Sequence, residues 1–286
     1  MTAAMVLAAG MGTRLRPLTD GLPKPLVPLG DRPLIEHVTG DLRAAGFSRI
    51  VANAFHCADK LEAWGLAANV IVSKEQSLLG TAGGVARARA HFGDDDVLVY
   101  NGDIVAHLDL AALSAALRGV AVLAVTPRPR GEGNVGVDIA GRVVRLRTVR
   151  VAEEHEGGFF TGIHTLSREL VAALPSEGCL VGDVYIPALL RGETLTAFAS
   201  RQPFTDLGTP DAYLSANLAW LGDRDAFQGE HASVAPGVRL RRSVVGRGAT
   251  VSGEGDLVDC VVWPGATAHA PLRRCVVTGR DVVRVA

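Results

Sequence analysis

The sequence predicts an α/β fold: a mixed, mainly parallel sheet covered by helices on both faces, followed by a short C-terminal β-helix. Through residues 1–125, short apolar runs alternate with amphipathic helical patterns, as in βαβ units. Residues 126–222 are more mixed and indicate a continuation of the sheet with an inserted part. Beyond Gly222, apolar residues recur every six positions among glycines, which is a β-helical period.

The expected strands are short apolar runs, and the expected helices have one apolar face. In the first part we expect strands at Ala3–Ala8, Ile50–Ala54, Val70–Ser73, Val97–Tyr100 and Val120–Val125. Helices are expected there at Leu34–Ala45, Ala58–Trp64, Thr81–His91 and Leu110–Leu117. Further along, strands are expected at Val135–Ile139, Phe159–His164 and Leu195–Ser200, and helices at Leu166–Leu174, Val184–Leu190 and Asp211–Leu221.

The change of pattern after Gly222 predicts two domains, residues 1–228 and 229–286. In the second, Val245, Val251, Leu257 and Trp263 mark the six-residue period. The period is imperfect, so a plain β-hairpin tail is the alternative. A solenoid buries its open end against something. We therefore expect the tail to serve packing or homo-oligomer formation and not chemistry.

Composition excludes several classes of protein. The chain has 286 residues, of which 48% are hydrophobic and 21% charged, and its net charge of −1 gives no basic footprint for nucleic acid. It has no apolar run of the roughly 18 residues that span a membrane. We read no signal peptide at its start. The cysteines, Cys57, Cys179, Cys260 and Cys275, lack metal-site spacing, so we expect reduced thiols and a cytoplasmic location.

The most informative motif follows the first expected strand. Gly10 and Gly12 let backbone amides approach a ligand. Arg14 follows closely, and a second cation, Lys24, stands between two prolines. The chain has 26 arginines and only three lysines, so a retained lysine is notable. Amides and two cations at a strand end indicate a polyphosphate site.

Other interpretations of these glycines are weaker. A dinucleotide fingerprint needs a third glycine where this chain has Leu15, which argues against a Rossmann-type oxidoreductase. The sequence has no Walker-type Gly-Lys-Ser/Thr. Gly10-x-Gly12 alone would fit an ordinary strand-to-helix turn, but the attached cations favour a phosphate site.

Two aspartates are candidate metal ligands. Asp103 follows the apolar strand that ends in Asn-Gly-Asp, and we expect it at the same sheet edge as Gly10. Asp206 lies in Phe-Thr-Asp-Leu-Gly-Thr-Pro, before a helix that Pro210 suits as a first-turn residue. Carboxylates beside a polyphosphate imply an intervening cation, usually Mg²⁺. A strand-ending turn and a helix cap are the structural alternatives for these two residues.

A third glycine-rich stretch runs from Glu75 to Gly84, with Gln76, Gly80 and Thr81 inside it. It follows a strand and opens a helix, so its small residues would let a flat ring lie against the backbone. A flexible loop is the alternative. His107 and His164 have no metal-type spacing, and we expect structural roles for both.

These motifs together resemble the sugar-1-phosphate nucleotidyltransferases along the whole chain. The resemblance implies a Rossmann-like catalytic domain and a left-handed, hexapeptide-type β-helix. Gly80-Thr-Ala-Gly83 and the Cys260-Val-Val-Trp263 tail are similar to the mannose-1-phosphate guanylyltransferase branch, which would use GTP. Asn101-Gly-Asp103 also occurs in uridylyltransferases of the N-acetylmuramate or N-acetylglucosamine type. A catalytically silent, nucleotide-sugar-binding regulatory subunit is a further alternative.

The resemblance also implies a role for each matching residue. Arg14, Lys24 and Asp103 would be catalytic, and Asp103 and Asp206 would hold Mg²⁺. The nucleoside triphosphate would contact Ala9, Gly10, Gly12, Thr13, Arg14, Gln76, Gly80 and Thr81. The sugar 1-phosphate would contact Gly136, Thr161 and Gly162.

One departure from the family concerns the sugar phosphate. Many members carry a Glu-Lys-Pro after the mid-chain strand, and its lysine grips the sugar phosphate. This chain has no lysine in the corresponding stretch, residues 146–155. Arg147 and Arg150 are the candidates to replace it, although arginine and lysine are not equivalent donors.

Overall fold

The computed structural model describes residues 3–285. By its internal contacts the chain forms two compact units. The first unit holds the residues up to Gly10 and Val38–Phe204, and the second holds Met11–His37 and the residues from Thr205 onward. The segment with Arg14 and Lys24 therefore belongs with the C-terminal part of the chain, whereas the strand before it belongs with the first unit.

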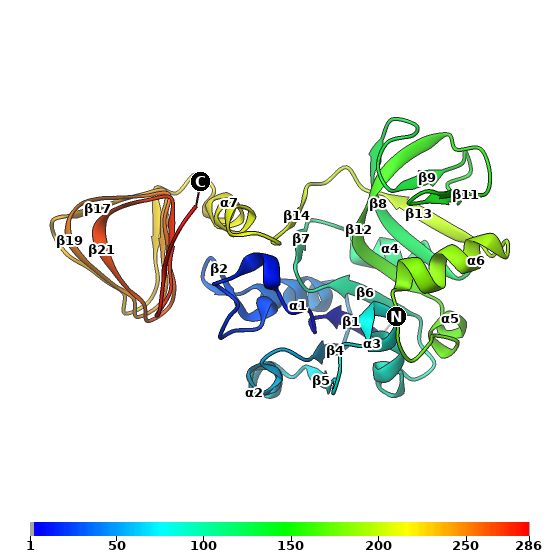
Figure 1. Cartoon of the computed structure of the whole chain (residues 1–286), viewed down its shortest axis with the longest axis horizontal. Coiled ribbons are helices and arrows are strands. Elements are labelled where there is room, and N and C mark those ends of the chain that lie inside the picture. The colour runs from blue at the N-terminus through cyan, green and yellow to red at the C-terminus, as the bar shows by residue number, and fades with distance from the viewer. Residues whose placement is uncertain (1–2, 286) are drawn as a thin grey trace. The chain divides into compact units, whose positions relative to one another are not determined.

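The first unit is built on a ten-stranded sheet (Figure 1). Its parallel centre is β6 (Val97–Asn101), β1 (Ala3–Leu7), β4 (Arg49–Ala54) and β5 (Ile71–Lys74), in that order. The long strand β12 (Glu156–Leu166) joins β6 in antiparallel direction. The rest of the sheet is β8 (Ala121–Arg128), β9 (Val135–Val137), β10 (Val143–Leu146), β11 (Val149–Arg150) and β13 (Leu195–Ala199). The expected mixed sheet with a mainly parallel centre is confirmed.

Helices lie on both faces of the sheet. α2 (Ala58–Ala68) joins β4 to β5, whereas α3 (Gly80–Ala88) joins β5 to β6 on the other side of β1. Because such connections are right-handed, these two helices cover opposite faces. The remaining elements are α1 (Leu34–Ala44), the 3-10 helix Arg89–His91, β7 (Ile104–Ala106) and α4 (Leu110–Ala115).

For two helices the predicted first residue is wrong. Leu166 still belongs to β12, and the helix expected over Leu166–Leu174 is only α5 (Arg168–Ala172), because the Ser167 side chain caps its first turn. The helix expected from Val184 begins earlier, as a π-helical turn over Leu180–Tyr185, and continues as α6 (Ile186–Leu190). Boundaries of this kind depend on caps that periodicity does not reveal.

The point where the strand order reverses lies between β1 and β6. Leu7 is paired with Asn101, so the two strands end level with each other. The Gly102 amide then donates to the Leu7 carbonyl at 2.9 Å. In parallel sheets this kind of switch point is where ligands bind. The two strands that precede the Gly10 loop and Asp103 therefore end at one edge of the sheet.

A buried ion pair fixes the antiparallel end of the sheet. The Arg145 Nε donates to Glu154 Oε2 at 2.6 Å, and Glu154 is 1% exposed. The Arg145 guanidinium also donates to four backbone carbonyls, two of them at Glu132 and Gly133. The hydrogen bond from Arg145 holds the pKa of the Glu154 carboxyl below its usual range, although desolvation opposes this. The pair therefore stabilises the fold above the ordinary glutamate pKa, and this contribution is lost as the pH falls through the lowered value.

The second unit begins with two 3-10 helices, Thr13–Leu15 and Lys24–Leu26, and the short pair β2 (Pro28–Leu29) and β3 (Arg32–Pro33). After β14 (Phe204–Asp206), which starts in the first unit, the chain forms α7 (Pro210–Leu221). The side chain of Thr209 caps α7 by accepting from the Ala212 amide, and Pro210 is at its first turn, as expected.

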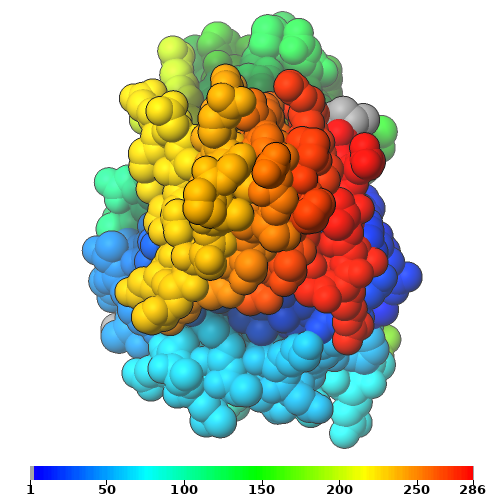
Figure 2. All heavy atoms as spheres, turned by 90° about the vertical axis from the view of Figure 1, so that its left-hand side faces the viewer, coloured from blue at the N-terminus to red at the C-terminus, as the bar shows by residue number. Residues whose placement is uncertain are grey.

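The tail consists of short strands stacked mostly in parallel, and Figure 2 shows its outer face with the colour changing from yellow to red across the stack. Ala226 pairs with Ser243 and Val244 with Val261, so each strand stacks on one from the previous turn of the chain. The strands are β15 (Ala226–Gln228), β16 (Ser233–Val234), β17 (Val238–Arg241), β18 (Ser243–Val245), β19 (Thr250–Val258), β20 (Val261–Val262), β21 (Thr267–Arg273), β22 (Cys275–Val277) and β23 (Val282–Arg284). Among the tail residues that the structure describes, β23 alone pairs in antiparallel direction, with β22.

All four cysteines are free thiols. Within residues 3–285, every helix is too short or too polar to cross a membrane.

We expect Arg145→Met to lower the free energy of unfolding by about 3–5 kcal/mol at pH 7, because it leaves Glu154 buried without its main partner. The control is Arg130→Ala, which removes an exposed pair with Glu153 and should cost less than about 1 kcal/mol. Denaturant titration measures both. The difference in the free energy of unfolding between wild type and Arg145→Met should become smaller in acid, because a protonated Glu154 carries no charge for a cation to balance. A difference that stays constant from pH 7 to acid would contradict the ion-pair explanation.

Candidate active site

Three charged side chains from distant parts of the sequence meet in the second unit. Arg14 Nη2 lies 3.4 Å from Asp206 Oδ2, and Lys24 Nζ lies 3.6 Å from Asp206 Oδ1. The side chain of Arg14 is 65% exposed and that of Asp206 is 44% exposed, whereas that of Lys24 is 10% exposed. The exposed Arg14–Asp206 pair adds little to stability. The cluster therefore presents one exposed cation, Arg14, and one largely buried cation, Lys24, and Asp206 partly neutralises both.

The geometry at Gly12 explains why the two halves of the motif occur together. Gly12 has a φ of 62°, in the left-handed region. A Cβ there would lie 3.0 Å from the Thr19 methyl and 3.3 Å from the Lys24 Cβ. The Thr19 hydroxyl donates to the Gly12 carbonyl at 2.8 Å. Gly12 is thus the place where the Arg14 segment and the Lys24 segment touch, and a larger residue would push them apart.

A second glycine keeps the Arg14 guanidinium close to the chain. A Cβ at Gly208 would lie 2.8 Å from that guanidinium. Gly208 follows Asp206 by two residues and is buried. The arginine therefore lies across the backbone just after its ion-pair partner.

In the first unit, the chain leaves β1 through Ala9 and Gly10. Ala9 is buried, and a Cβ at Gly10 would meet open space, so the backbone there can be approached. Thr13 starts the 3-10 helix that carries Arg14. Asp103 is half-buried just after β6. Ala9, Gly10 and Asp103 lie at the expected sheet edge of the first unit, whereas Thr13 belongs to the second unit. The contacts of all four residues with a ligand remain predictions.

Sequence reasoning missed a buried polar network at the same edge. Asn53, at the end of β4, accepts from the Ala8 amide at 2.6 Å and donates to Glu75 at 2.7 Å. Glu75 is 4% exposed and also accepts from the Leu79 amide at 3.2 Å. The network ties together the ends of β1, β4 and β5. The only sequence signal was a polar residue inside the apolar run Ile50–Ala54, which does not predict a partner.

The loop that we expected to contact the base has a structural role as well. Gly80 has a φ of 74°, and a side chain there would collide with the Gly178 carbonyl. The Thr81 hydroxyl accepts from the Leu180 amide at 2.8 Å. Gln76 is exposed. Gly80 and Thr81 therefore hold the segment around Leu180, and their contact with a nucleotide stays a prediction.

The three residues expected at the sugar also have partners within the sheet. A side chain at Gly136 would collide with the Glu154 carboxylate, and one at Gly162 would collide with Asn101. The Thr161 hydroxyl donates to the Ala124 carbonyl at 3.0 Å. Packing alone thus accounts for these residue types. A sugar-binding role for them is left as a prediction.

The two arginines considered as replacements for the missing lysine are already engaged. Arg150 lies 3.4 Å from the buried Glu154 carboxylate, and Arg147 lies 3.8 Å from the Cys179 sulfur. Arg147 also has a φ of 54°. Neither contact identifies the residue that would hold a sugar phosphate.

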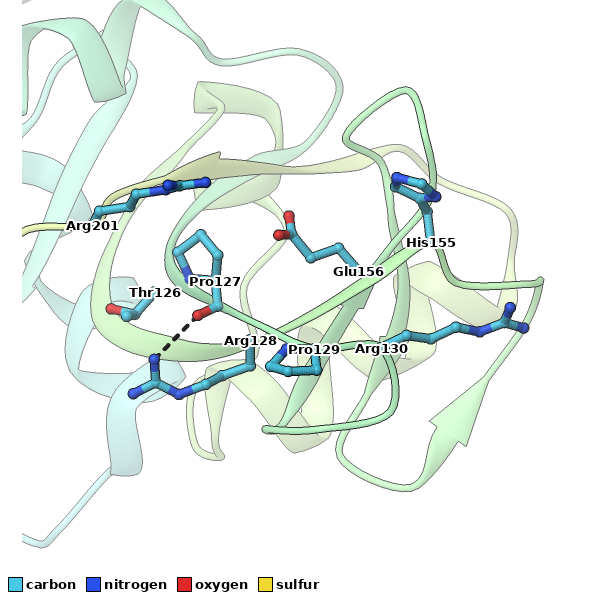
Figure 3. Close-up of a pocket in the computed structure, with 8 residues that line it drawn as sticks. All are labelled: Thr126, Pro127, Arg128, Pro129, Arg130, His155, Glu156 and Arg201. Atoms are coloured by element: carbon cyan, nitrogen blue, oxygen red, sulfur yellow. Dashed lines mark hydrogen bonds between the residues drawn. The ribbon is translucent and has the colours of Figure 1, made fainter.

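A cleft of about 610 Å³ opens at the antiparallel end of the first unit (Figure 3). It is lined by Thr126, Pro127, Arg128, Pro129, Arg130, His155, Glu156 and Arg201. None of the sequence-predicted site residues line it. Figure 3 shows the Arg128 side chain turned back onto the Pro127 carbonyl, whereas the Glu156 side chain lies near the middle of the labelled residues and Arg201 lies to its left.

Of the two histidines expected to be structural, His107 is exposed and His164 is deep in the core. His164 is 2% exposed, and its Nδ1 is paired with the Tyr185 hydroxyl at 2.7 Å. Burial lowers the pKa of His164 to about 3, so it is neutral at physiological pH. Among residues 3–285, no cluster of three or more His, Cys, Asp or Glu side chains could hold a metal ion by itself.

Comparison with known proteins gives the chain a family. The nucleotidyl transferase model matches residues 3–147. A mannose-1-phosphate guanylyltransferase of Mycobacterium tuberculosis is 28% identical over 292 residues, 93% of this chain and 81% of that protein. An N-acetylmuramate alpha-1-phosphate uridylyltransferase of Neisseria meningitidis is 41% identical, but over 117 residues, 38% of this chain and 50% of that protein.

A solved structure agrees in fold. HddC from Yersinia pseudotuberculosis, crystallised with GMP-PN, superposes with a TM-score of 0.65 at 23% identity, covering 77% of this chain and 100% of that one. At this identity the likeness shows the fold only. With the family model over half of the sequence and a relative along nearly all of it, the chain belongs to the nucleotidyl transferase family, among the sugar-1-phosphate nucleotidyltransferases.

Proposed function

We propose that the chain transfers a nucleotidyl group from GTP to mannose 1-phosphate, giving GDP-mannose and pyrophosphate. The observation that carries this proposal is the cluster of Arg14, Lys24 and Asp206, in which two cations share one carboxylate. The choice of guanine and mannose rests on the relative that matches nearly the whole chain.

The roles of the residues are those that the family resemblance implies. The open backbone at Gly10 and the amides up to Thr13 hold the triphosphate. Arg14 neutralises the β- and γ-phosphates and the departing pyrophosphate. Lys24, largely buried, contacts the α-phosphate and the incoming sugar phosphate. Gln76, Gly80 and Thr81 meet the base or ribose, and Gly136, Thr161 and Gly162 line the sugar pocket.

The reaction is an in-line attack of a sugar-phosphate oxygen on the α-phosphorus. One P–O bond forms, the bond to the bridging oxygen breaks, and pyrophosphate leaves with the electron pair. The nucleophile is already anionic, so no general base is required. The chain's contribution is positioning together with neutralisation of charge.

Asp103 and Asp206 fit Mg²⁺ as ligands. Both are carboxylates, and Mg²⁺ typically takes one or two of these together with substrate phosphates and not a full protein cage. The ion supplies charge neutralisation when it is bound. Arg14 and Lys24 would then turn from Asp206 toward phosphate oxygens.

We further propose that residues 229–286 form a left-handed β-helix that supports the catalytic domain and contributes to a homo-oligomer. The parallel stacking of its strands supports a helix of this type. Val245, Val251 and Leu257 of the six-residue period are all buried in the tail's own core, which a hairpin would not require. We place the enzyme, with its free thiols, in the cytoplasm.

A second candidate is a uridylyltransferase that acts on N-acetylmuramate 1-phosphate or a related sugar. The higher identity to the Neisseria relative favours it, but this similarity covers only part of the chain. The experiment that separates the candidates is a panel of four nucleoside triphosphates crossed with several sugar 1-phosphates, read as pyrophosphate release. GTP with mannose 1-phosphate should give the highest kcat/KM. If no pair of nucleoside triphosphate and sugar 1-phosphate releases pyrophosphate, the result would support a silent regulatory subunit instead.

The first mutational prediction concerns the metal. Asp103→Asn and Asp206→Asn should each lower kcat by at least about 100-fold in Mg²⁺, because each removes a major electrostatic contribution. Asp256→Asn is the control, since Asp256 pairs with Arg239 in the tail and should leave kcat unchanged. Near-normal turnover of Asp103→Asn would rule out its metal role.

The second concerns Lys24. A compact ammonium can contact two phosphates, whereas a planar guanidinium favours one. Lys24→Arg should therefore fold but lose much of its rate, and Lys24→Ala should lose on the order of 2–4 kcal/mol of transition-state stabilisation. Steady-state kinetics with both substrates would show the loss in kcat. If only KM for the triphosphate changes, Lys24 is a binding residue and not a catalytic one.

A further inference from the structure

One face of α7 contacts the segment that follows Lys24 and holds it in place. The Pro28 carbonyl accepts from the Tyr213 hydroxyl at 2.5 Å. The Gly30 amide donates to Asn217 Oδ1 at 2.9 Å. The Trp220 ring lies where a side chain on Gly30 would be. Tyr213, Asn217 and Trp220 are spaced by four and three residues, so they lie on the same side of the helix.

This contact is buried and well paired. Tyr213 and Asn217 are both 0% exposed, and the Asn217 amide donates to the Tyr213 carbonyl at 3.0 Å. His37 also anchors the loop, because its Nε2 is paired with the Leu29 carbonyl at 2.8 Å. Pro23, Pro25 and Pro28 limit the freedom of the backbone. Lys24 thus lies at the start of a stiff segment that residues of α7 hold in place.

The tail reaches this contact through Trp263. The Trp263 Nε1 donates to the Tyr213 hydroxyl at 2.9 Å, and the two rings meet edge to face at 6.5 Å. An indole nitrogen can only donate, so the hydroxyl accepts here and its single proton goes to the Pro28 carbonyl. Burial raises the pKa of Tyr213, which keeps that proton in place. A second link joins Arg274 of the tail to Asp211 of α7 at 3.1 Å.

We propose that Tyr213 and Trp263 are positioning residues for the phosphate site: the tail holds the Tyr213 hydroxyl, and that hydroxyl holds the loop carrying Lys24. This inference rests on the proposed phosphate role of Lys24. It gives residues 229–286 a part in catalysis, although no tail residue need touch a substrate.

The test uses the full chain with conservative variants. Tyr213→Phe removes the hydroxyl and leaves both partners unpaired, whereas Trp263→Phe removes the indole donor together with part of the ring. Hydrogen exchange followed by mass spectrometry should show faster exchange of the Val27, Leu29 and Gly30 amides in both variants. The dissociation constant of inorganic pyrophosphate in Mg²⁺, measured by calorimetry, should rise by about 5- to 20-fold in Tyr213→Phe and by less in Trp263→Phe.

The double variant distinguishes a relay from two separate effects. Both hydrogen bonds meet at one hydroxyl, which Tyr213→Phe already removes. The double variant should therefore have the same dissociation constant for pyrophosphate as Tyr213→Phe alone, within about twofold. Tyr185→Phe is the matched control. Tyr185 is also fully buried and also loses a hydroxyl partner, His164, but it lies in the first unit. It should lower stability without changing pyrophosphate binding or exchange in the loop.

Each outcome decides the proposal. Unchanged loop exchange and unchanged pyrophosphate binding in Tyr213→Phe, with only a lower unfolding midpoint, would reduce Tyr213 to a packing residue and overturn it. Fully additive losses in the double variant would overturn the relay. A wild-type chain that binds no pyrophosphate would overturn both this proposal and the phosphate role of the loop. Pyrophosphate binding without turnover of any substrate pair would instead refute the proposed reaction and leave the positioning inference standing.

Discussion

The candidate site depends on holding two like charges close together, one exposed on Arg14 and one largely buried on Lys24. These two cations repel each other, and the Asp206 carboxylate, which pairs with both, offsets this repulsion. That carboxylate comes from a segment nearly 200 residues away, so the fold must bring it back to the start of the chain. The Arg14–Asp206 part of the cluster is exposed and adds little to stability.

The contacts that hold the Arg14 and Lys24 segments lie in the second unit, in agreement with the division of the chain into two units. The Arg14 and Lys24 segments are grouped with α7 and the tail, and not with the sheet that precedes and follows them. Gly12 lets the two segments touch, and the face of α7 formed by Tyr213, Asn217 and Trp220 holds the loop beyond Lys24. The sheet has its own buried polar supports, Asn53 with Glu75 and Arg145 with Glu154. Each unit therefore fixes its own candidate residues through a small number of buried hydrogen bonds.

Several residues that first suggested substrate contact also have reasons in packing. Gly136 faces Glu154, Gly162 faces Asn101, and Gly80 faces the Gly178 carbonyl. A glycine required by a close neighbour does not exclude a ligand, since close packing of backbone is also what brings amides near a substrate. It does mean that the residue type alone is weak evidence for substrate contact at these positions.

The sequence by itself determined the alternating sheet, the phosphate motif and the family, because short apolar runs and the Gly-x-Gly-Thr-Arg with Pro-Lys-Pro are local patterns. It also identified Pro210 at the start of α7, since first-turn prolines follow a local steric rule. Tertiary structure alone decided that Asn53 is bonded to Glu75, that Asp206 lies against Arg14 and Lys24, and that Tyr213 joins Trp263 to Pro28. Each of these contacts joins residues far apart in the chain. Their partners are chosen by which buried polar groups remain unpaired once the strands and helices have packed, and no periodicity in the sequence records that choice.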